Sequence, residues 1–345
     1  MILSVVNHEE HLLTYDTPKP HYQIPKYPIV LCHGFSGFDH LFQLPMFSTL
    51  PPLTDKFKNL FNKKIQSSSS AATSSASQLS NNETVQNMGI DNKSLINNSN
   101  TKYLIEYWNG IKKNLQVHGC NVLIAKVPPF ASIETRASIL DKFLINSLPY
   151  IRENNKHLPT NKPIKINLIA HSMGGLDCRY LIHQNEKFPN NHYEIVSLTT
   201  ISTPHRGTSI ANFLINSLPN YLIENYFPSI FQLTTNYAKN FNTKIIDNPN
   251  VKYFSYGAKM NPDPTSMFLI TWKIINDIEG PNDGMVSLKS CKWGEFKGFL
   301  DDVDHADLIN WMGILKKTKL ALGISNFNPN YFYLDIINNL AINNL

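Results

Sequence analysis

The sequence predicts an α/β fold in which a mostly parallel central sheet carries helices on both faces. Short apolar runs alternate with helical patterns, and small-residue turns follow several of those runs. The chain has 345 residues, of which 42% are hydrophobic, so it is long enough to bury one large core. In such a sheet the carboxyl ends of the strands meet at one edge, where we expect the functional residues.

The predicted elements alternate along the chain. Strands are expected over 27–31, 121–127, 164–170 and 194–201, and helices over 103–117, 134–148 and 173–183. Ser132 is a candidate cap for the second of these helices. This alternation places Gly34, Ser172 and Thr203 directly after strands, at the same edge of the sheet.

The predicted domain organisation is one large domain with two flanking segments. We expect an N-terminal extension over 1–26, the α/β domain over 27–316 and a C-terminal tail over 317–345. Residues 66–100 are rich in serine and asparagine and have no apolar periodicity, which is typical of a disordered insertion.

Ser172 lies in a pattern that is typical of a nucleophile elbow. An apolar strand runs into Ala170-His171-Ser172-Met173-Gly174-Gly175 and a helix follows. The serine oxygen must stand on a very tight turn, so its neighbours must be small. Ala170 replaces the glycine that begins the usual motif, which adds a single methyl group. The alternative is an ordinary strand-turn-helix junction.

A nucleophilic serine needs a histidine as base and a carboxylate to orient that histidine. In folds with this elbow the order along the chain is serine, acid, histidine. His205 follows Ser172 too early for an acid to lie between them, whereas Asp283, in a turn-forming cluster, precedes His305. We therefore predict Ser172, Asp283 and His305 as the catalytic residues. The alternatives for the acid are the aspartates next to His305 in sequence, Asp301, Asp302 and Asp304.

The developing negative charge of a tetrahedral intermediate needs backbone N–H donors. We expect one from the residue after the serine, Met173, and one from Phe35 in the loop after the first strand. Arg136 is a candidate brace for that loop, with a solvated helix arginine as the alternative. His171, next to the serine, is interpreted as a packing residue.

Five motifs together resemble a known family. They are His33-Gly34-Phe35-Ser36-Gly37, Ala170-His171-Ser172-Met173-Gly174-Gly175, Ser202-Thr203-Pro204-His205-Arg206-Gly207, Asn282-Asp283-Gly284-Met285-Val286-Ser287 and His305-Ala306-Asp307. Over roughly residues 27–313 the chain resembles the true-lipase family of Pseudomonas and Burkholderia, and within it most closely the mitochondrial triacylglycerol lipases of yeast.

The resemblance implies an α/β-hydrolase fold, hydrolysis of acylglycerols and the same catalytic and oxyanion residues, with no cofactor needed. The bacterial members bind a structural calcium ion near the catalytic histidine. Asp307 matches one of its carboxylate ligands, but Trp311 stands where a polar ligand is expected. Asp307 is therefore a calcium candidate only by resemblance.

Residues 208–247 match the position of the lid in the resembling lipases. This segment contains many large apolar residues, which indicates either core or a cover that opens at a lipid surface. The expected partner is accordingly an acylglycerol at a lipid–water interface, with peripheral contact to a membrane or lipid droplet.

The composition excludes several other classes. The formal charge of +5 is mild, and neither a basic run nor zinc-ligand spacing supports nucleic-acid binding. No apolar run approaches the ~20 residues that span a bilayer. The first ten residues match neither a secretory signal nor a transit peptide. The four cysteines show no close pairing and are interpreted as free core thiols. An intracellular protein is expected, mitochondrial by resemblance, with the cytosol as the alternative.

The leading hypothesis is a serine lipase that cleaves tri- and diacylglycerols through an acyl-enzyme. A phospholipase or an acyltransferase would keep the same triad, because the acceptor is chosen by the shape of the pocket. A scaffold that binds without catalysis is the third hypothesis.

Overall fold

The computed structural model describes residues 11–35, 106–154, 162–189, 191–217, 227–264 and 266–345. The chain divides into two units, Met1–Gln43 with Glu106–Leu345, and Leu44–Ile105. The predicted insertion at 66–100 lies outside the described residues.

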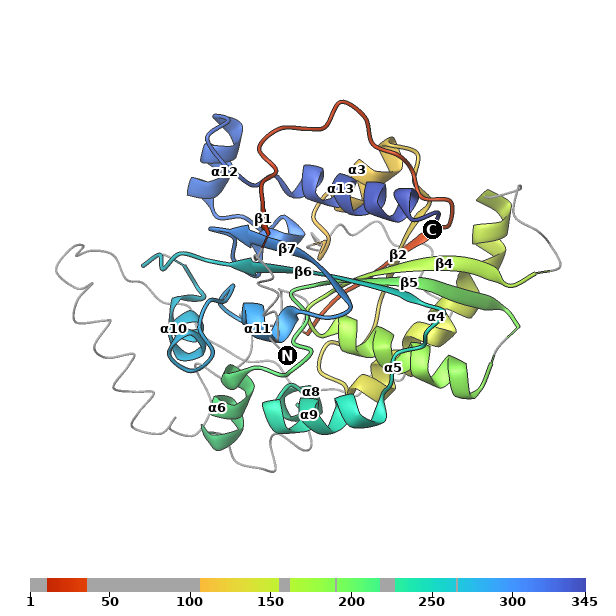
Figure 1. Cartoon of the computed structure of the whole chain (residues 1–345), viewed down its shortest axis with the longest axis horizontal. Coiled ribbons are helices and arrows are strands. Elements are labelled where there is room, and N and C mark those ends of the chain that lie inside the picture. The colour runs from red at the N-terminus through yellow and green to blue at the C-terminus, as the bar shows by residue number, and fades with distance from the viewer. Residues whose placement is uncertain (1–10, 36–105, 155–161, 190, 218–226, 265) are drawn as a thin grey trace, which may run out of the picture. The chain divides into compact units, whose positions relative to one another are not determined.

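The described part of the chain contains a seven-stranded sheet in the order β1-β7-β6-β5-β4-β2-β3 (Figure 1). The strands are β1 Leu12–Leu13, β2 Ile29–Cys32, β3 Val122–Ala125, β4 Ile164–His171, β5 Tyr193–Ile201, β6 Lys252–Lys259 and β7 Glu295–Asp301. Every neighbouring pair is parallel. This confirms the predicted fold class.

Helices cover both faces of the sheet (Figure 1). Helices α3 Ile111–Val117 and α13 Pro329–Ile342 lie on one face, and α4 Ile133–Asn154 and α5 Gly174–Lys187 lie on the other. The prediction of a helix over 103–117 is wrong in part, because residues 106–110 are not helical. Gly110 has a φ of 70°, a left-handed conformation that cannot continue an α-helix, so α3 begins only after it.

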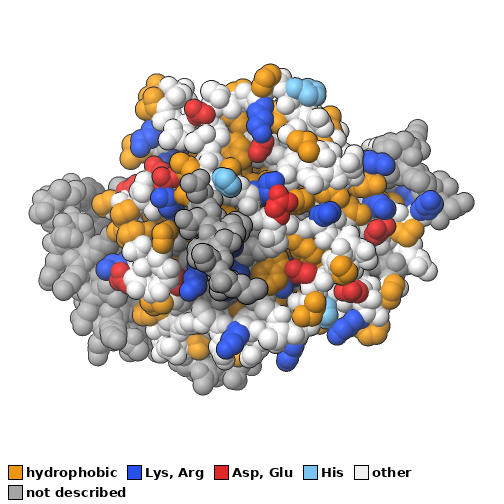
Figure 2. All heavy atoms as spheres, in the orientation of Figure 1, with side chains coloured by type: hydrophobic (Ala, Val, Ile, Leu, Met, Phe, Trp, Pro, Cys, Tyr) orange, Lys and Arg blue, Asp and Glu red, His pale blue; other side chains and the backbone are white. Residues whose placement is uncertain are grey.

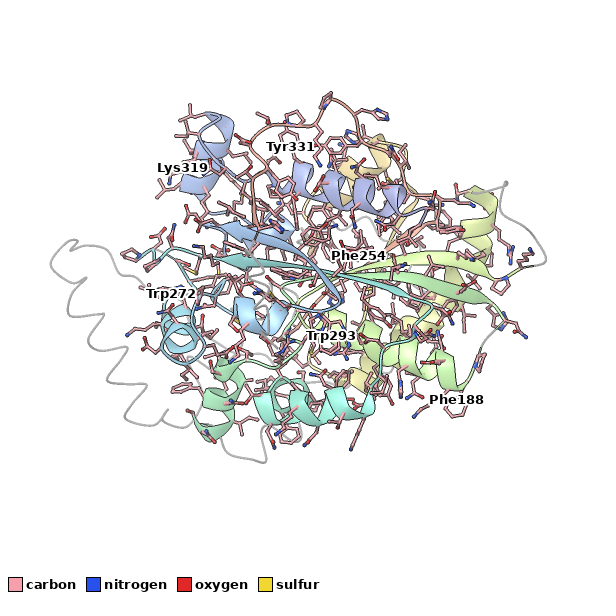
Figure 3. All side chains as sticks on the ribbon, in the orientation of Figure 1. Phe188, Phe254, Trp272, Trp293, Lys319 and Tyr331 are labelled. Atoms are coloured by element: carbon pink, nitrogen blue, oxygen red, sulfur yellow. The ribbon has the colours of Figure 1, made fainter. Side chains whose placement is uncertain are left out.

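Two hydrophobic cores lie on the two faces of the sheet, and strand β2 contributes to both. Ile29 and Leu31 belong to the core under α3 and α13, whereas Val30 and Cys32 belong to the core under α4 and α5. Successive side chains of a strand point to opposite faces, so an unbroken apolar run is what a strand buried on both faces requires. Phe254 of β6, labelled in Figure 3, is buried in the first core.

Both flanking segments contribute to this fold. In the predicted extension, β1 pairs with β7 at the edge of the sheet. In the predicted tail, α13 buries Phe332, Tyr333 and Ile336 in the first core. Neither position is visible in local sequence patterns, because both depend on partners hundreds of residues away.

Five further helices and one short 3₁₀ turn lie around the carboxyl ends of the strands among the described residues. They are α6 Ser209–Ser217, α8 Pro228–Gln232, α9 Thr235–Lys244, α10 Leu269–Ile278, α11 Leu288–Cys291 and the turn η2 Asp307–Ile309. Helix α12, Ile314–Ala321, follows η2.

The visible surface carries charges of both signs (Figure 2), and the thiols lie in the core. Positive and negative side chains are intermixed on the visible face (Figure 2). All four cysteines are buried and free, which confirms that they are core thiols. Among the residues that the structure describes, no helix is both long and apolar enough to cross a membrane.

Candidate active site

Ser172 stands on a sharp turn between β4 and α5. Its φ is 56°, a left-handed conformation that is uncommon for a residue other than glycine. The strained turn is fixed from both sides, because the Ser172 N–H donates to Ile201 O at 3.0 Å and the Thr203 hydroxyl donates to Ser172 O at 2.7 Å. A strained backbone that is held by its surroundings is typical of a functional position.

Three glycines allow the backbone to pack closely around this serine. A Cβ atom on Gly174 would lie 2.7 Å from the carbonyl oxygens of Cys32 and His33, and one on Gly175 would lie 2.3 Å from Thr203 Oγ1. A Cβ atom on Gly34 would lie 2.5 Å from Ser172 Cβ and 3.0 Å from Ser172 Oγ. The loop after β2 therefore lies directly against the candidate nucleophile.

Asp283 and His305 are brought together by loops that follow β6 and β7. The Nδ1 atom of His305 donates to Asp283 Oδ2 at 2.7 Å, and the His305 backbone N–H donates to Asp283 O at 2.9 Å. Asp283 Oδ1 accepts from the backbone N–H groups of Met285 and Val286 at 2.9 and 2.8 Å. The carboxylate is thus buried, fully bonded and oriented, and Nδ1 is committed to it, which leaves Nε2 of His305 for proton transfer.

The other aspartates near His305 have different partners. Asp301 pairs with Lys259, and Asp304 Oδ1 accepts the N–H groups of Ala306 and Asp307, which holds the turn after His305. Asp302 is exposed. The structure therefore supports Asp283 over these alternatives as the acid that orients the histidine.

Arg136 braces the loop after β2. It is fully buried on α4, and its Nη2 atom donates to the carbonyl oxygens of His33 and Gly34 at 2.9 and 3.1 Å. Its Nε atom donates to Asp177 Oδ2 at 2.8 Å, which supplies the opposite charge inside the protein. The brace inferred from the sequence is confirmed, and the solvated alternative is wrong.

Asp177 lies in an unusual environment for a carboxylate. Burial raises its pKa to about 6, although Arg136 acts in the opposite direction. Its Oδ1 atom has no hydrogen-bond partner among the described residues, which agrees with the raised pKa.

Tyr107 and His171 link the loop to the candidate base, and this link was not predicted. The Gly34 N–H donates to the Tyr107 hydroxyl at 3.0 Å, and this hydroxyl lies 2.7 Å from His171 Nδ1. Burial and the neighbouring His305 lower the pKa of His171 well below its usual value, so His171 is neutral and its Nδ1 accepts from Tyr107. The rings of His171 and His305 lie 4.4 Å apart.

This contact places His305 beside the elbow, because His171 directly precedes Ser172. The Phe268 ring lies edge-on to the His305 ring, with the ring centres 6.4 Å apart. The sequence interpretation of His171 as a packing residue is thus too narrow. A histidine immediately before the candidate nucleophile was the only signal in the sequence, and Tyr107 had none because its partners are distant along the chain.

The candidate oxyanion residues lie on the two segments that meet at the serine. Met173 directly follows Ser172 and is fully buried, and Phe35 directly follows Gly34. Their side chains belong to one apolar cluster with residues of α6, α8 and α9, including Ala211, Ile230 and Phe241. The described part of the predicted lid therefore packs against the candidate oxyanion residues.

The residues around Asp307 do not fit a calcium site. The Lys316 ammonium group bonds to Asp307 Oδ2 and lies 3.4 Å from Asp304 Oδ2, so a side-chain cation already neutralises these carboxylates. The Trp311 indole presents an N–H, which donates to Glu106 O and Tyr107 O, where a calcium ligand would be an acceptor. Among the described residues, no group of three or more acidic, histidine or cysteine side chains could hold a metal.

His205 is not placed to act as the base. It is buried, it stacks on Trp293 with ring centres 5.0 Å apart, and its Nε2 lies 3.0 Å from the Thr200 hydroxyl. Arg179 covers the same indole at 3.6 Å. Burial and the nearby guanidinium of Arg179 lower the pKa of His205, so its imidazole is neutral.

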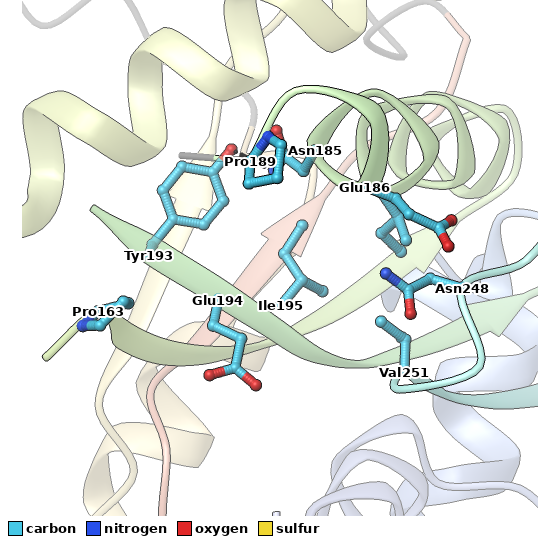
Figure 4. Close-up of a pocket in the computed structure, with 10 residues that line it drawn as sticks. Pro163, Asn185, Glu186, Pro189, Tyr193, Glu194, Ile195, Asn248 and Val251 are labelled. Carbon is cyan, nitrogen blue, oxygen red and sulfur yellow. Dashed lines mark hydrogen bonds between the residues drawn. The ribbon is translucent and has the colours of Figure 1, made fainter. Parts of the chain in front are cut away.

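One surface pocket lies far from this site. It has a volume of about 210 Å³ and is lined by Pro163, Glu194 and Val251 among others (Figure 4). These residues lie at the amino ends of β4, β5 and β6, whereas Ser172 follows the carboxyl end of β4. The pocket is therefore on the opposite edge of the sheet.

Comparison with known proteins identifies relatives for most of the chain. Residues 139–236 match the family described as putative serine esterase (DUF676). Triacylglycerol lipase 2 of Saccharomyces cerevisiae is 39% identical over 336 residues, which cover 93% of each chain. A triacylglycerol lipase of Burkholderia plantarii is 33% identical over 111 residues, 32% of this chain and 27% of that protein.

A solved structure supports the fold independently. Lipase 1 of Pelosinus fermentans superposes with a TM-score of 0.55 over 92% of this chain and 99% of its own, at 16% sequence identity. At that identity the likeness concerns the fold alone.

Proposed function

The chain belongs to the family of the yeast triacylglycerol lipase 2, and from this we infer that it is a serine lipase that cleaves the ester bonds of tri- and diacylglycerols. The observation that carries the mechanism is the oriented Asp283–His305 pair beside the strained turn of Ser172. The Pseudomonas and Burkholderia true-lipase family is proposed as the wider group, on the local match alone.

We propose that Ser172 Oγ attacks the ester carbonyl while His305 Nε2 takes its proton. Asp283 holds Nδ1 and stabilises the imidazolium that forms. The N–H groups of Met173 and Phe35 donate to the oxyanion. The proton then passes to the departing glycerol oxygen, which leaves an acyl-enzyme. Water attacks that ester with the same histidine as base, and the fatty acid is released.

The test is hydrolysis of a triglyceride series of increasing chain length by the purified protein and by Ser172→Ala and His305→Asn. We expect both variants to lose roughly 10⁴-fold or more in kcat, because the members of a triad act as a unit. His118→Asn, an exposed histidine remote from the site, is the matched control and should keep full activity.

A folded wild-type protein that cleaves no triglyceride would contradict the lipase proposal. Transfer of the acyl group to another alcohol or cleavage of phospholipids would then identify the acyltransferase or phospholipase. If a fluorophosphonate probe failed to label Ser172, the protein would be a scaffold without catalysis.

We also propose that the substrate is met at a lipid–water interface and that the segment 208–247 acts as a lid. The packing of α6, α8 and α9 against Met173 and Phe35 supports a cover over the site. For the location we propose the inside of the cell, the mitochondrion by resemblance or else the cytosol. The four free buried thiols support a reducing compartment, and cell fractionation would test this.

A further inference from the structure

Helix α12 and its flanks form an exposed apolar knob. The exposed fractions are 83% for Ile314, 67% for Leu315, 68% for Leu322 and 66% for Ile324, and no residue of α12 is buried. Single exposed aliphatic residues are ordinary on a protein surface. Four within eleven positions indicate a surface that contacts something apolar.

The charges of the same segment are all positive. From Leu308 to Leu334 the chain carries three lysines, at 316, 317 and 319, and no aspartate or glutamate. Lys317 and Lys319 are exposed, whereas Lys316 points inward to Asp307. Aliphatic side chains beside exposed cations are the composition that binds the headgroup region of an anionic bilayer.

The knob is held beside the candidate active site. Helix α12 follows η2, which begins two residues after His305, and the Lys316 ammonium bonds to Asp307 of that turn. Lys319 lies at the end of the molecule opposite Phe188 (Figure 3), and orange side chains border the same region in Figure 2. A lipid surface that contacts α12 would therefore lie at the end of the molecule where the substrate is cleaved.

We propose that residues 313–324 (the α12 knob) dock the protein on an anionic lipid surface, with Ile314, Leu315, Leu322 and Ile324 in the headgroup boundary and Lys317 and Lys319 on the lipid charges. This deepens the proposed lipase function and rests on it, because a lipase must reach an aggregated substrate. A second copy of the chain is a poorer occupant, since four aliphatic side chains present far less than the ~800 Å² per partner of a stable dimer.

The experiment is binding to sedimented vesicles that contain no triglyceride, so the result does not depend on lipase activity. Vesicles of phosphatidylcholine alone are compared with vesicles that also contain phosphatidylglycerol. Leu315→Ser/Leu322→Ser should weaken binding to the anionic vesicles by about tenfold or more, because it removes methylene groups that would insert into the lipid. Lys317→Glu/Lys319→Glu should weaken binding to the anionic vesicles and remove their advantage over neutral ones.

The matched control is Val117→Ser/Phe188→Ser. These side chains are 76% and 73% exposed at the ends of α3 and α5, at the other edge of the sheet, and their loss should leave vesicle binding unchanged. Thermal unfolding verifies that each variant is folded.

Three results would overturn the proposal. The first is a wild-type protein that binds no vesicle, and the second is a Leu315→Ser/Leu322→Ser variant that binds as tightly as wild type. The third is a wild-type dimer in light scattering that this variant turns into a monomer without any change in vesicle binding. Absence of triglyceride hydrolysis with intact anionic vesicle binding would instead sink only the lipase proposal.

Discussion

At the scale of single residues, the loop after β2 is positioned by groups that themselves take no part in bond making. Arg136 holds the carbonyl oxygens of His33 and Gly34, and Tyr107 accepts the N–H of Gly34. Carbonyl and N–H groups fixed in this way orient the following N–H, that of Phe35. Tyr107 and Arg136 are thus positioning residues for the proposed oxyanion donors.

Removal of one hydroxyl tests this positioning. Tyr107→Phe should lower kcat by about tenfold with KM changed less than twofold, because loop geometry affects the transition state more than binding. Stability should fall by about 1–3 kcal/mol, because the Gly34 N–H and His171 Nδ1 both lose the hydroxyl as a partner. Steady-state kinetics on a soluble ester and urea unfolding measure the two effects.

Tyr253→Phe is a matched control, because its hydroxyl also accepts a backbone N–H, that of Asn248 at 3.0 Å, at the far edge of the sheet. It should lose about 1 kcal/mol of stability for its single hydrogen bond and keep its kcat. An equal loss of kcat in both variants would refute a positioning role of Tyr107.

The sequence predicts the residues of the site better than their supports. The elbow at Ser172 and the turn that carries Asp283 can be predicted from local sequence patterns, because each depends on a few neighbouring residues. Tyr107, Lys316 and the contact between His171 and His305 depend on segments far apart along the chain. Such contacts leave no local pattern, so they emerge only from the packed structure.

At the scale of elements, Lys316 ties α12 to the turn that carries His305. Asp307 is 1% exposed, and burial together with Asp304 raises its pKa to about 7 although Lys316 acts against this. Lys316→Met should therefore leave a buried carboxyl without its cation, which should cost about 2–3 kcal/mol of stability and reduce kcat.

Lys317→Met is the control on the same helix, since Lys317 is exposed, and it should change stability by less than about 0.5 kcal/mol. Lys316→Arg should recover part of the loss, because it restores the charge. Equal stability of the Lys316→Met and Lys317→Met variants in urea unfolding would show that the tie contributes nothing.

The proposed lid is the second element to test. Phe227 packs edge-on to Phe130 at 5.5 Å, and Phe231 is 52% exposed. Phe227→Ser/Phe231→Ser should reduce activity on emulsified ester at least about tenfold more than activity on a soluble short-chain ester, because only the emulsion requires an apolar surface on the lid. Phe188→Ser serves as the exposed control. An equal loss of activity on both substrates would show that this segment is part of the core and not a lid.

At the scale of the whole molecule, buried titratable groups make stability depend on pH in opposing ways. Burial lowers the pKa of His33 to about 4 and lowers those of His171 and His205 well below their usual value, so the stability that these groups provide above pH 6.5 is lost as the pH falls. Asp177 and Asp307 have raised pKa values, so their effect is most favourable at low pH and is lost as the pH rises through about 6 and 7.

Near pH 5 the unfolded chain therefore binds about three more protons at these histidines, whereas the folded protein binds about two more at the two carboxyls. The net of about one proton predicts that the free energy of unfolding falls by roughly 1.4 kcal/mol per pH unit on acidification. Asp177→Asn removes one opposing group and should roughly double that slope. Urea unfolding between pH 6.5 and 5 measures it, and a flat or rising stability on acidification would contradict the assignment.

The all-parallel sheet also determines when the site can exist during folding. No two strands of the described sheet are joined as a hairpin, and β2 pairs with β3 and β4 across long stretches of chain. Each strand pairing therefore requires the closure of a long loop, and the entropy of that closure is lost before the strand contacts can stabilise the chain. This slows folding to the native topology. Ser172 follows β4 and His305 follows β7, and β5 and β6 lie between these two strands in the sheet. The two residues can therefore come together only after all four strands have paired. Esterase competence should accordingly appear only in the final kinetic phase of refolding, after most secondary structure has formed.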